Sequence, residues 1–424
     1  MFIRIICFAF LFAHFGIIDA QPEIQYENKD YVDHVKSVRF HAANLATFYP
    51  IVGLNTGGGS LQLSFDDLNP GDARTFKYTV IHCDSDWQPS QLSYFEYLDR
   101  FEEGDMNDYQ FSFQTAQPYV HYRLFLPNRD INWTLSGNYL LFVYEEEKEK
   151  PILTRRFIVA EQIVNILPQM AIPGDISKNR THHEIDFVVN HEGFDFRNAR
   201  NDISATVLQN GRWDNAVMDI PPYLERSGEI LDFNYQNKIS FEAGREWRQI
   251  DLRSLRFPSA DIADVTRYDD GYFVTLLKDL KRAGNPYSGY NDLNGAYVIE
   301  NKDLNNEELT SEYCKVLFTL YSPTKYEDKD IYLFGAMSNW ELKKEFKMAY
   351  NNQYNSYMGN PMLKQGFYSY QYVMVDKDGN KDFETLEGND YQTENEYTII
   401  IYYHPFGARY DQVIAAQTFE SDRI

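Results

Sequence analysis

Short runs of aromatic and β-branched residues, separated by turn-forming residues, recur along this chain from Val38 onward. Three of the clearest runs are Thr75–Cys83, Asn138–Glu146 and Ile152–Ala160. Such runs are typical of pleated strands, and the 3.6-residue period of long helices is nearly absent. An aromatic content of 16% agrees, because aromatic side chains favour half-buried sheet surfaces. The pattern predicts an all-β chain made of serial immunoglobulin-like or early-set β-sandwich domains.

Two segments of linker-like composition divide the chain. The run Val164–Asp175 contains Pro168 and Pro173, and the run Asn301–Ser311 is rich in Asn and Glu. A length of 424 residues corresponds to two to four domains at roughly 100–200 residues each. We predict a signal peptide at residues 1–20, an N-terminal β-sandwich domain at 21–160, a middle β-rich domain at 161–305 and a C-terminal early-set-like β-sandwich domain at 306–424.

The N-terminus has the composition of a cleavable secretory signal. Arg4 supplies a positive charge, Ile5–Ile18 is apolar, and Ala20 precedes Gln21 at the expected cleavage site. The apolar stretch is shorter than the roughly 20 residues of a spanning helix, and no basic stop-transfer cluster follows it. We therefore expect an exported, periplasmic protein.

The formal net charge of -23 limits the classes of partner that the chain can bind. Such a surface repels nucleic-acid phosphates and anionic lipid headgroups, so we expect neither nucleic-acid binding nor direct lipid insertion. Transmembrane β-barrels also alternate by strand, but outward charges and variable loops do not fit a continuous lipid-facing band. Cys83 and Cys314 remain after processing, and we expect two buried thiols, although export also permits a bridge.

Four places in the sequence superficially resemble sites for ligands or catalysis. They are the glycine-rich run Asn55–Ser60, the acidic run Asp376–Asp382, the pair His182–His183 with His191 nearby, and the carboxylates Asp84 and Asp86. The first lacks the lysine of a phosphate loop, and the second has its glycine at the wrong place for a calcium loop. Adjacent histidines on a strand point to opposite faces, and the two aspartates fit a turn. We predict no catalytic, metal-binding or cofactor-binding residue, and no enzyme activity.

Trp340 raises a different possibility. The segment Ile331–Trp340 has the strand, turn and tryptophan order of early-set modules that bind α-glucans. An indole in this position could stack on a sugar ring, or it could close the apolar end of a sandwich. The alternative function is therefore a periplasmic carbohydrate-binding protein that uses Trp340 as its sugar platform.

Six segments, taken together, resemble the plug protein family of the type IX secretion system. They are Tyr78–Thr115, Tyr119–Asp130, Ser136–Tyr144, Gln209–Ala216, Leu293–Ile299 and Leu363–Val373. The resemblance implies a periplasmic protein that docks on the periplasmic mouth of the giant outer-membrane translocon barrel. It also implies that the protein occludes the pore when no substrate is passing, with residues 21–160 as a plug domain. This is a steric function, and the resemblance supplies no catalytic residues or cofactor.

A lid of this kind needs a contact surface for the translocon. The region around Gln88–Leu98 is rich in aromatic residues. We hypothesise that Trp87, Tyr94 and Phe95 anchor the partner, while surrounding carboxylates meet basic groups on the translocon. Ordinary sandwich packing is the competing explanation for each of these side chains.

Overall fold

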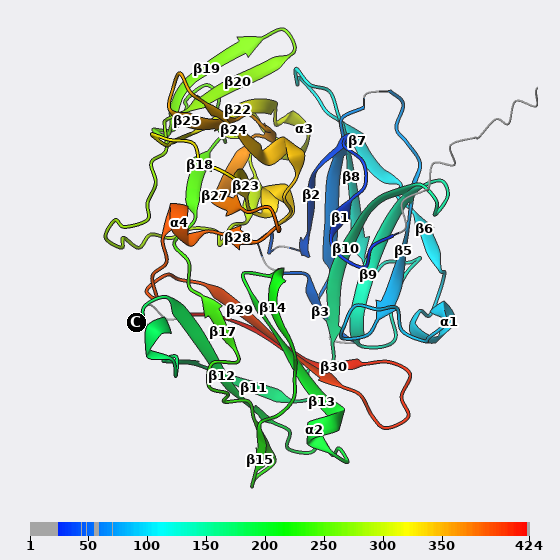
Figure 1. Ribbon diagram of the computed structural model, residues 1–424. Coiled ribbons are helices and arrows are strands. Elements are labelled where there is room, and N and C mark those ends of the chain that lie inside the picture. The colour runs from blue at the N-terminus through cyan, green and yellow to red at the C-terminus, as the bar shows by residue number, and fades with distance from the viewer. Residues whose placement is uncertain (1–23, 44, 48, 55–58, 70, 422–424) are drawn as a thin grey trace, which may run out of the picture.

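The computed structural model describes residues 24–43, 45–47, 49–54, 59–69 and 71–421 (Figure 1). Within these ranges, strands dominate and the helices are single short turns, so the predicted all-β sandwich class is confirmed. The predicted signal peptide at residues 1–20 lies outside the described residues. None of the helices described is both long and apolar enough to cross a membrane.

The first domain is a sandwich of two sheets, on the right in Figure 1. One sheet has the order β1-β10-β9-β5-β6, with β3 also pairing β10, and the other has the order β2-β4-β8-β7. Alternate residues of both sheets, such as Phe65, Phe76 and Phe157, share one apolar core between them. The elements are β1 (Lys29–Asp30), β2 (Val35–Ala42), β3 (Ile51–Gly53), β4 (Leu61–Asp67), β5 (Phe76–Cys83), α1 (Tyr94–Tyr97), β6 (Glu103–Asp105), β7 (Asp108–Phe111), β8 (Val120–Leu126), β9 (Gly137–Glu145) and β10 (Pro151–Ala160).

The middle domain, at the bottom of Figure 1, is also a two-sheet sandwich. Its sheets have the orders β11-β12-β16-β15, with β17 on β12, and β14-β13-β29-β30. Its core holds Phe187 and Phe233 from one side and Ile399 from the other. The elements are β11 (Asn165–Ala171), η1 (Ile176–Lys178), β12 (His182–Asn190), α2 (Ala199–Asp202), β13 (Ile203–Gln209), β14 (Arg212–Ile220), β15 (Leu224–Arg226), β16 (Ile230–Asp232), β17 (Ser240–Glu242), β29 (Glu396–Tyr403) and β30 (Gln412–Glu420).

The third domain, at the upper left of Figure 1, is an eleven-stranded sheet with the main order β18-β27-β23-β24-β25-β22-β20-β19. It surrounds one core, because Phe318 of β22 and Tyr370 of β27 belong to the same apolar cluster. The elements are β18 (Arg248–Asp251), β19 (Ile262–Tyr268), β20 (Gly271–Leu276), β21 (Tyr297–Ile299), α3 (Glu307–Thr310), β22 (Tyr313–Tyr321), β23 (Asp330–Phe334), η2 (Ala336–Ser338), η3 (Lys344–Phe346), β24 (Lys347–Asn351), β25 (Ser356–Gly359), β26 (Met362–Lys364), β27 (Gly366–Val375), β28 (Lys381–Asp382) and α4 (Glu384–Glu387).

Strand pairing does not follow the predicted border at residues 305 and 306. Strands β18 and β21 precede this border, yet both pair with β27, and β20 pairs in parallel with β22. Strand β29 returns to the middle domain, where Ile203 to Gln209 face Tyr403 to Tyr397. The middle and third domains are therefore interleaved along the chain. The two runs of linker-like composition are themselves structured, because Val164–Asp175 contains β11 and Asn301–Ser311 contains α3, and composition does not show which strands pair across them.

Candidate functional site

Two of the three predicted anchor residues lie on the exposed helix α1. The helix begins after Ser93, whose backbone N–H donates to Glu96 Oε2 at 2.8 Å in a capping box. Phe95 is 69% exposed, Tyr94 is also exposed, and their ring centroids lie 5.7 Å apart. Both rings are therefore accessible to a partner, and their role as anchors stays a prediction.

The third predicted anchor, Trp87, has a different place. Its side chain is buried, with 1% exposure, and its ring centroid lies 4.9 Å from that of Trp213 on β14 of the middle domain. The Arg156 guanidinium lies 4.5 Å from the Trp87 centroid and 5.2 Å from the Trp213 centroid. Trp87 thus joins two domains of this chain. Contrary to the hypothesis that it anchors the translocon, its indole is buried and is not available to an external partner.

A second interdomain contact is a buried ionic cluster around Asp66 of β4. Lys364 of β26 donates to Asp66 Oδ2 at 2.6 Å, and the Tyr313 hydroxyl donates to the same oxygen at 2.6 Å. His121 Nδ1 lies 2.6 Å from Asp66 Oδ1. The side chains of Asp66 and Lys364 are only 1% and 2% exposed. The cluster links the first domain to the third with almost no access to water.

The surroundings of Asp66 hold it ionised. Burial alone raises the pKa of a carboxyl, but Lys364 and the hydrogen bond from His121 outweigh burial and lower the pKa of Asp66. Burial likewise opposes protonation of His121, but its hydrogen bonds with Asp66 and Glu308 raise its pKa. Removal of either charged partner would leave an uncompensated buried charge, which is strongly destabilising.

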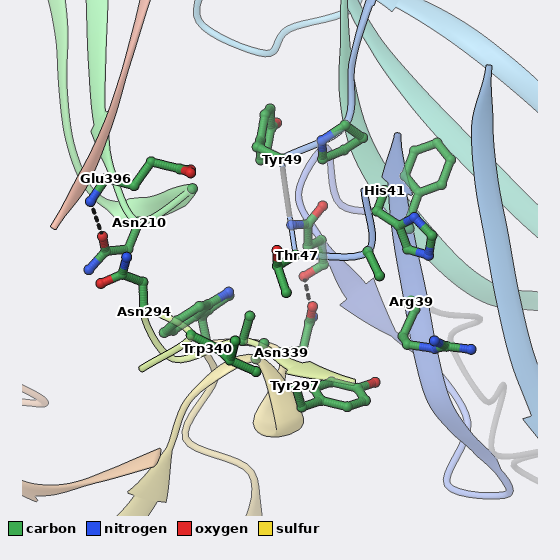
Figure 2. Close-up of a pocket in the computed structure, with 18 of the residues that line it drawn as sticks. Arg39, His41, Thr47, Tyr49, Asn210, Asn294, Tyr297, Asn339, Trp340 and Glu396 are labelled. Atoms are coloured by element: carbon green, nitrogen blue, oxygen red, sulfur yellow. Dashed lines mark hydrogen bonds between the residues drawn. The ribbon is translucent and has the colours of Figure 1, made fainter. Parts of the chain in front are cut away.

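The three domains also enclose a pocket of about 270 Å³ (Figure 2). The first domain contributes His41 and Tyr49, the middle domain contributes Asn210, and the third contributes Asn294 and Trp340. The lining also includes Arg39, Asp292, Asn339, Glu394, Glu396 and Glu420. Amides, an indole and charges of both signs are groups that can hold a small polar molecule.

Trp340 is packed at the same time as it lines this pocket. Its ring centroid lies 5.4 Å from that of Trp247 and 5.7 Å from that of Phe334. The Arg212 guanidinium lies 5.4 Å from the ring centroid. The indole therefore closes an apolar cluster at the end of the third domain, and the same side chain also borders the pocket.

Two of the carboxyl groups that line the pocket are hard to ionise. Burial, with the nearby charge of Glu420, raises the pKa of Glu396 to about 7. Burial also raises the pKa of Asp292 to about 7, although the N–H groups of Asn294 and Trp247 hydrogen-bond to its carboxylate. The backbone N–H of Glu396 donates to Asn210 Oδ1 at 2.9 Å (Figure 2). Glu396 and Asp292 therefore bind protons at a pH where ordinary carboxyls are ionised.

The remaining candidate sites of the sequence form structural contacts. Asp376 Oδ1 accepts the N–H groups of Asp378 and Asn380, so the acidic run is a turn. His183 Nδ1 lies 2.8 Å from the Tyr397 hydroxyl, inside the middle domain. Among the described residues, no three His, Cys, Asp or Glu side chains are grouped so that they could hold a metal ion. The run Asn55–Ser60 lies partly outside the described residues.

The sequence also predicted that Asp84 and Asp86 form a turn and that Cys83 and Cys314 are buried thiols. Asp86 Oδ1 accepts the Gln88 N–H at 2.9 Å, and burial raises the pKa of Asp84 to about 6 in the same turn. Cys83 and Cys314 are both buried and both free, which confirms the expectation of two separate thiols.

No motif in the sequence marks the Asp66 cluster. Asp66 follows Phe65 and precedes Asp67, and Lys364 is the last residue of β26, so each charge lies near the end of a strand, where charged residues are ordinary. The pairing of Asp66 with Lys364 depends on domain docking, which local sequence does not report.

Two segments of the chain match the models of known protein families. Residues 35–161 match the model of the type 9 secretion system plug protein 1st domain, and residues 313–399 match that of a starch binding domain. The first match covers the whole sandwich from β2 to β10. The second begins at β22 and ends in β29, so it covers much of the third domain and includes Trp340.

A solved structure extends the similarity to nearly the whole chain. A hypothetical protein from Parabacteroides merdae is 32% identical, with a TM-score of 0.88 over 94% of this chain and 100% of that chain. The C-terminal domain of the Streptococcus pyogenes antigen I/II-family protein AspA has a TM-score of only 0.16 at 7% identity, over 92% of this chain and 100% of that chain, and carries no argument. No curated protein matches the chain.

The plug-family match covers the two sheets and the core of the first domain and includes the turn that holds Trp87. It includes three of the six segments that carry the resemblance, Tyr78–Thr115, Tyr119–Asp130 and Ser136–Tyr144, and it ties the chain to type IX secretion and to the cell envelope. The chain belongs to the type IX secretion system plug protein family.

Proposed function

We propose that this chain is the periplasmic plug of a type IX translocon. The signal-like N-terminus directs its export, and the mature protein docks on the periplasmic side of the giant outer-membrane barrel. It occludes the pore when no substrate is passing. The function is steric, so the protein acts by binding and not as an enzyme.

The observation that carries this proposal is the way in which the domains are joined. A plug has to resist deformation while it covers a wide opening. The buried pair of Asp66 and Lys364 connects the first domain to the third, and the contact of Trp87 with Trp213 connects the first to the middle. The middle and third domains are interleaved through β18 and β29. Each domain is thus held by both of the others, as expected for a rigid cap.

Outer-membrane permeability tests the proposal directly. Deletion of the gene in a strain with the translocon should increase the uptake of a large antibiotic that the intact outer membrane excludes. The same deletion in a strain without the translocon should have no effect, because no pore is then left open. An intact barrier in the first strain, or equal leakage in both, would contradict the proposal.

Carbohydrate binding is a second candidate, and the starch-binding match over residues 313–399 favours it. The ligand would enter the pocket of about 270 Å³ and contact Trp340. Titration calorimetry with maltooligosaccharides should then show binding that the Trp340→Ala variant loses. The Tyr354→Ala variant, which removes an exposed ring elsewhere in the third domain, serves as the control. Absence of heat with the parent protein would argue against this candidate.

A further inference from the structure

Strand β7 exposes a row of aromatic side chains at the edge of the first domain. It is the last strand of the sheet β2-β4-β8-β7, and all four of its residues are exposed. Tyr109 and Phe111 lie on one face of the strand, and Phe113 follows two residues later. Phe111 is 55% exposed, and the other two rings are also exposed. Large apolar surface of this kind is a mark of interaction sites.

The aromatic residues Tyr109, Phe111 and Phe113 are held in place by the core of the first domain and by the third domain. The Tyr109 ring centroid lies 5.7 Å from that of Tyr122, a core residue of β8, and 6.3 Å from that of Phe111. Beyond the strand, the Phe113 N–H donates to the Leu309 carbonyl of the third domain at 2.9 Å. The edge is therefore ordered before any partner arrives, which lowers the entropic cost of binding.

The backbone of β7 has unused hydrogen-bonding groups. The Ser112 N–H donates to the Tyr119 carbonyl, and β7 pairs antiparallel with β8 so that Phe111 faces Val120. In an antiparallel ladder, alternate residues bond to the neighbouring strand, so the N–H and C=O groups of Tyr109 and Phe111 point away from β8. No further strand in the described part of the chain pairs with this edge.

Sheet edges in soluble proteins are usually protected by lysine, proline or a bulge. The run from Asp108 to Phe113 contains neither lysine nor proline, and its pairing with β8 has no register shift. We propose that β7 is a docking edge to which an extended segment of another protein adds as a further strand. The apolar side chains at alternate positions of that segment cover Tyr109 and Phe111.

Charge indicates the chemistry of this segment. The exposed carboxylate of Asp105 precedes the strand, and the chain carries a net charge of -23. Two copies of such a chain repel one another, so β7 is poorly suited to pairing with itself. The occupant is therefore an uncharged or basic extended segment of a different protein. This inference rests on the proposed function, which makes the translocon barrel the protein that provides the segment.

Hydrogen exchange with purified translocon in detergent tests the docking edge. Binding should slow amide exchange in the segment from Tyr109 to Phe111. The Phe111→Pro variant removes an outward N–H but no bond to β8, and it should weaken binding about tenfold or more. The double variant Tyr109→Lys, Phe111→Lys keeps the backbone and should weaken binding similarly. Phe257→Ser removes an exposed ring from the third domain and should bind like the parent.

The outcomes separate the two proposals. Translocon binding with unchanged exchange in β7, and with equal affinity for all variants, would overturn the docking edge and leave the plug function standing. A parent protein that does not bind the translocon would overturn both. Formation of a dimer that Phe111→Pro abolishes would show a second copy as the occupant, and this would also overturn the inference.

Discussion

At Asp66, three donors from different parts of the chain converge on a carboxylate that has almost no contact with water. His121 belongs to the same domain, whereas Tyr313 and Lys364 belong to the third. The cation of Lys364 also lies 4.1 Å from the Tyr119 ring centroid. A buried charge of this kind is stable only while all of its partners remain in place. The relative position of two domains is therefore coupled to single side chains.

The Lys364→Met variant should lose about 3–5 kcal/mol of stability, because it leaves Asp66 buried without its cation. Chemical unfolding followed by fluorescence measures this loss. The matched control is Lys377→Met, because Lys377 pairs with Asp328 on the surface and such pairs contribute at most about 1 kcal/mol. Equal unfolding midpoints for the two variants would contradict the role given to Lys364.

The raised pKa of Glu396 predicts that the stability of the protein depends on pH. Its folded pKa of about 7 lies above its ordinary value of 4.5, so the native state binds the proton more tightly than the unfolded state between these values. Its contribution to stability is therefore complete at low pH and is lost as the pH rises through about 7. The Glu396→Gln variant should lose less stability than the parent between about pH 5 and about pH 8 in urea titrations. The exposed Glu327→Gln serves as the control, and parallel pH profiles for the parent and Glu396→Gln would contradict the prediction.

Trp87 and Phe95 illustrate what sequence can say about single residues. Both are aromatic residues in one turn-rich region, yet one is buried against Trp213 and the other is exposed. Phe95 lies within the capping box of Ser93 and Glu96, which can be recognised locally. The burial of Trp87 depends on a residue of another domain, and no local pattern specifies that contact.

At the scale of elements, the strands themselves were predictable and several of their partners were not. The predicted run Thr75–Cys83 corresponds to β5, and Ile152–Ala160 corresponds to β10. Alternation of side chains reports such strands because it reflects which face is buried. The pairing of β13 with β29 joins segments separated by the whole third domain. These two strands find each other because their apolar faces fit the same core, and the local sequence of neither strand specifies the other.

This interleaving predicts how fragments behave. A fragment of residues 306–424 lacks β18, β20 and β21, and its strand β29 loses its partner β13. It should therefore remain largely unfolded in near-ultraviolet circular dichroism and hydrogen exchange. A fragment of residues 162–421 holds every described strand of the middle and third domains and should fold. A cooperatively folded 306–424 fragment would show that the interleaved strands are dispensable.

At the scale of the whole molecule, the interdomain contacts should make unfolding cooperative. The first domain has its own core, but it shares the Asp66 cluster with the third domain and the Trp87 contact with the middle domain. If these contacts couple the domains strongly, calorimetry of the parent protein should show one unfolding transition. A protein of this size would otherwise unfold domain by domain, with several transitions.

A variant that carries both Lys364→Met and Trp213→Ala weakens both interfaces and leaves most of each core intact. Its calorimetric trace should separate into at least two transitions, with the first domain unfolding apart from the interleaved pair. The exposed substitutions Phe257→Ser and Tyr354→Ala, combined in one protein, should keep the single transition of the parent. Separate transitions in the parent itself would mean that the domains are only loosely joined. A loosely joined chain would not provide the stiffness on which steric closure of a pore depends, so this measurement also bears on the proposed function.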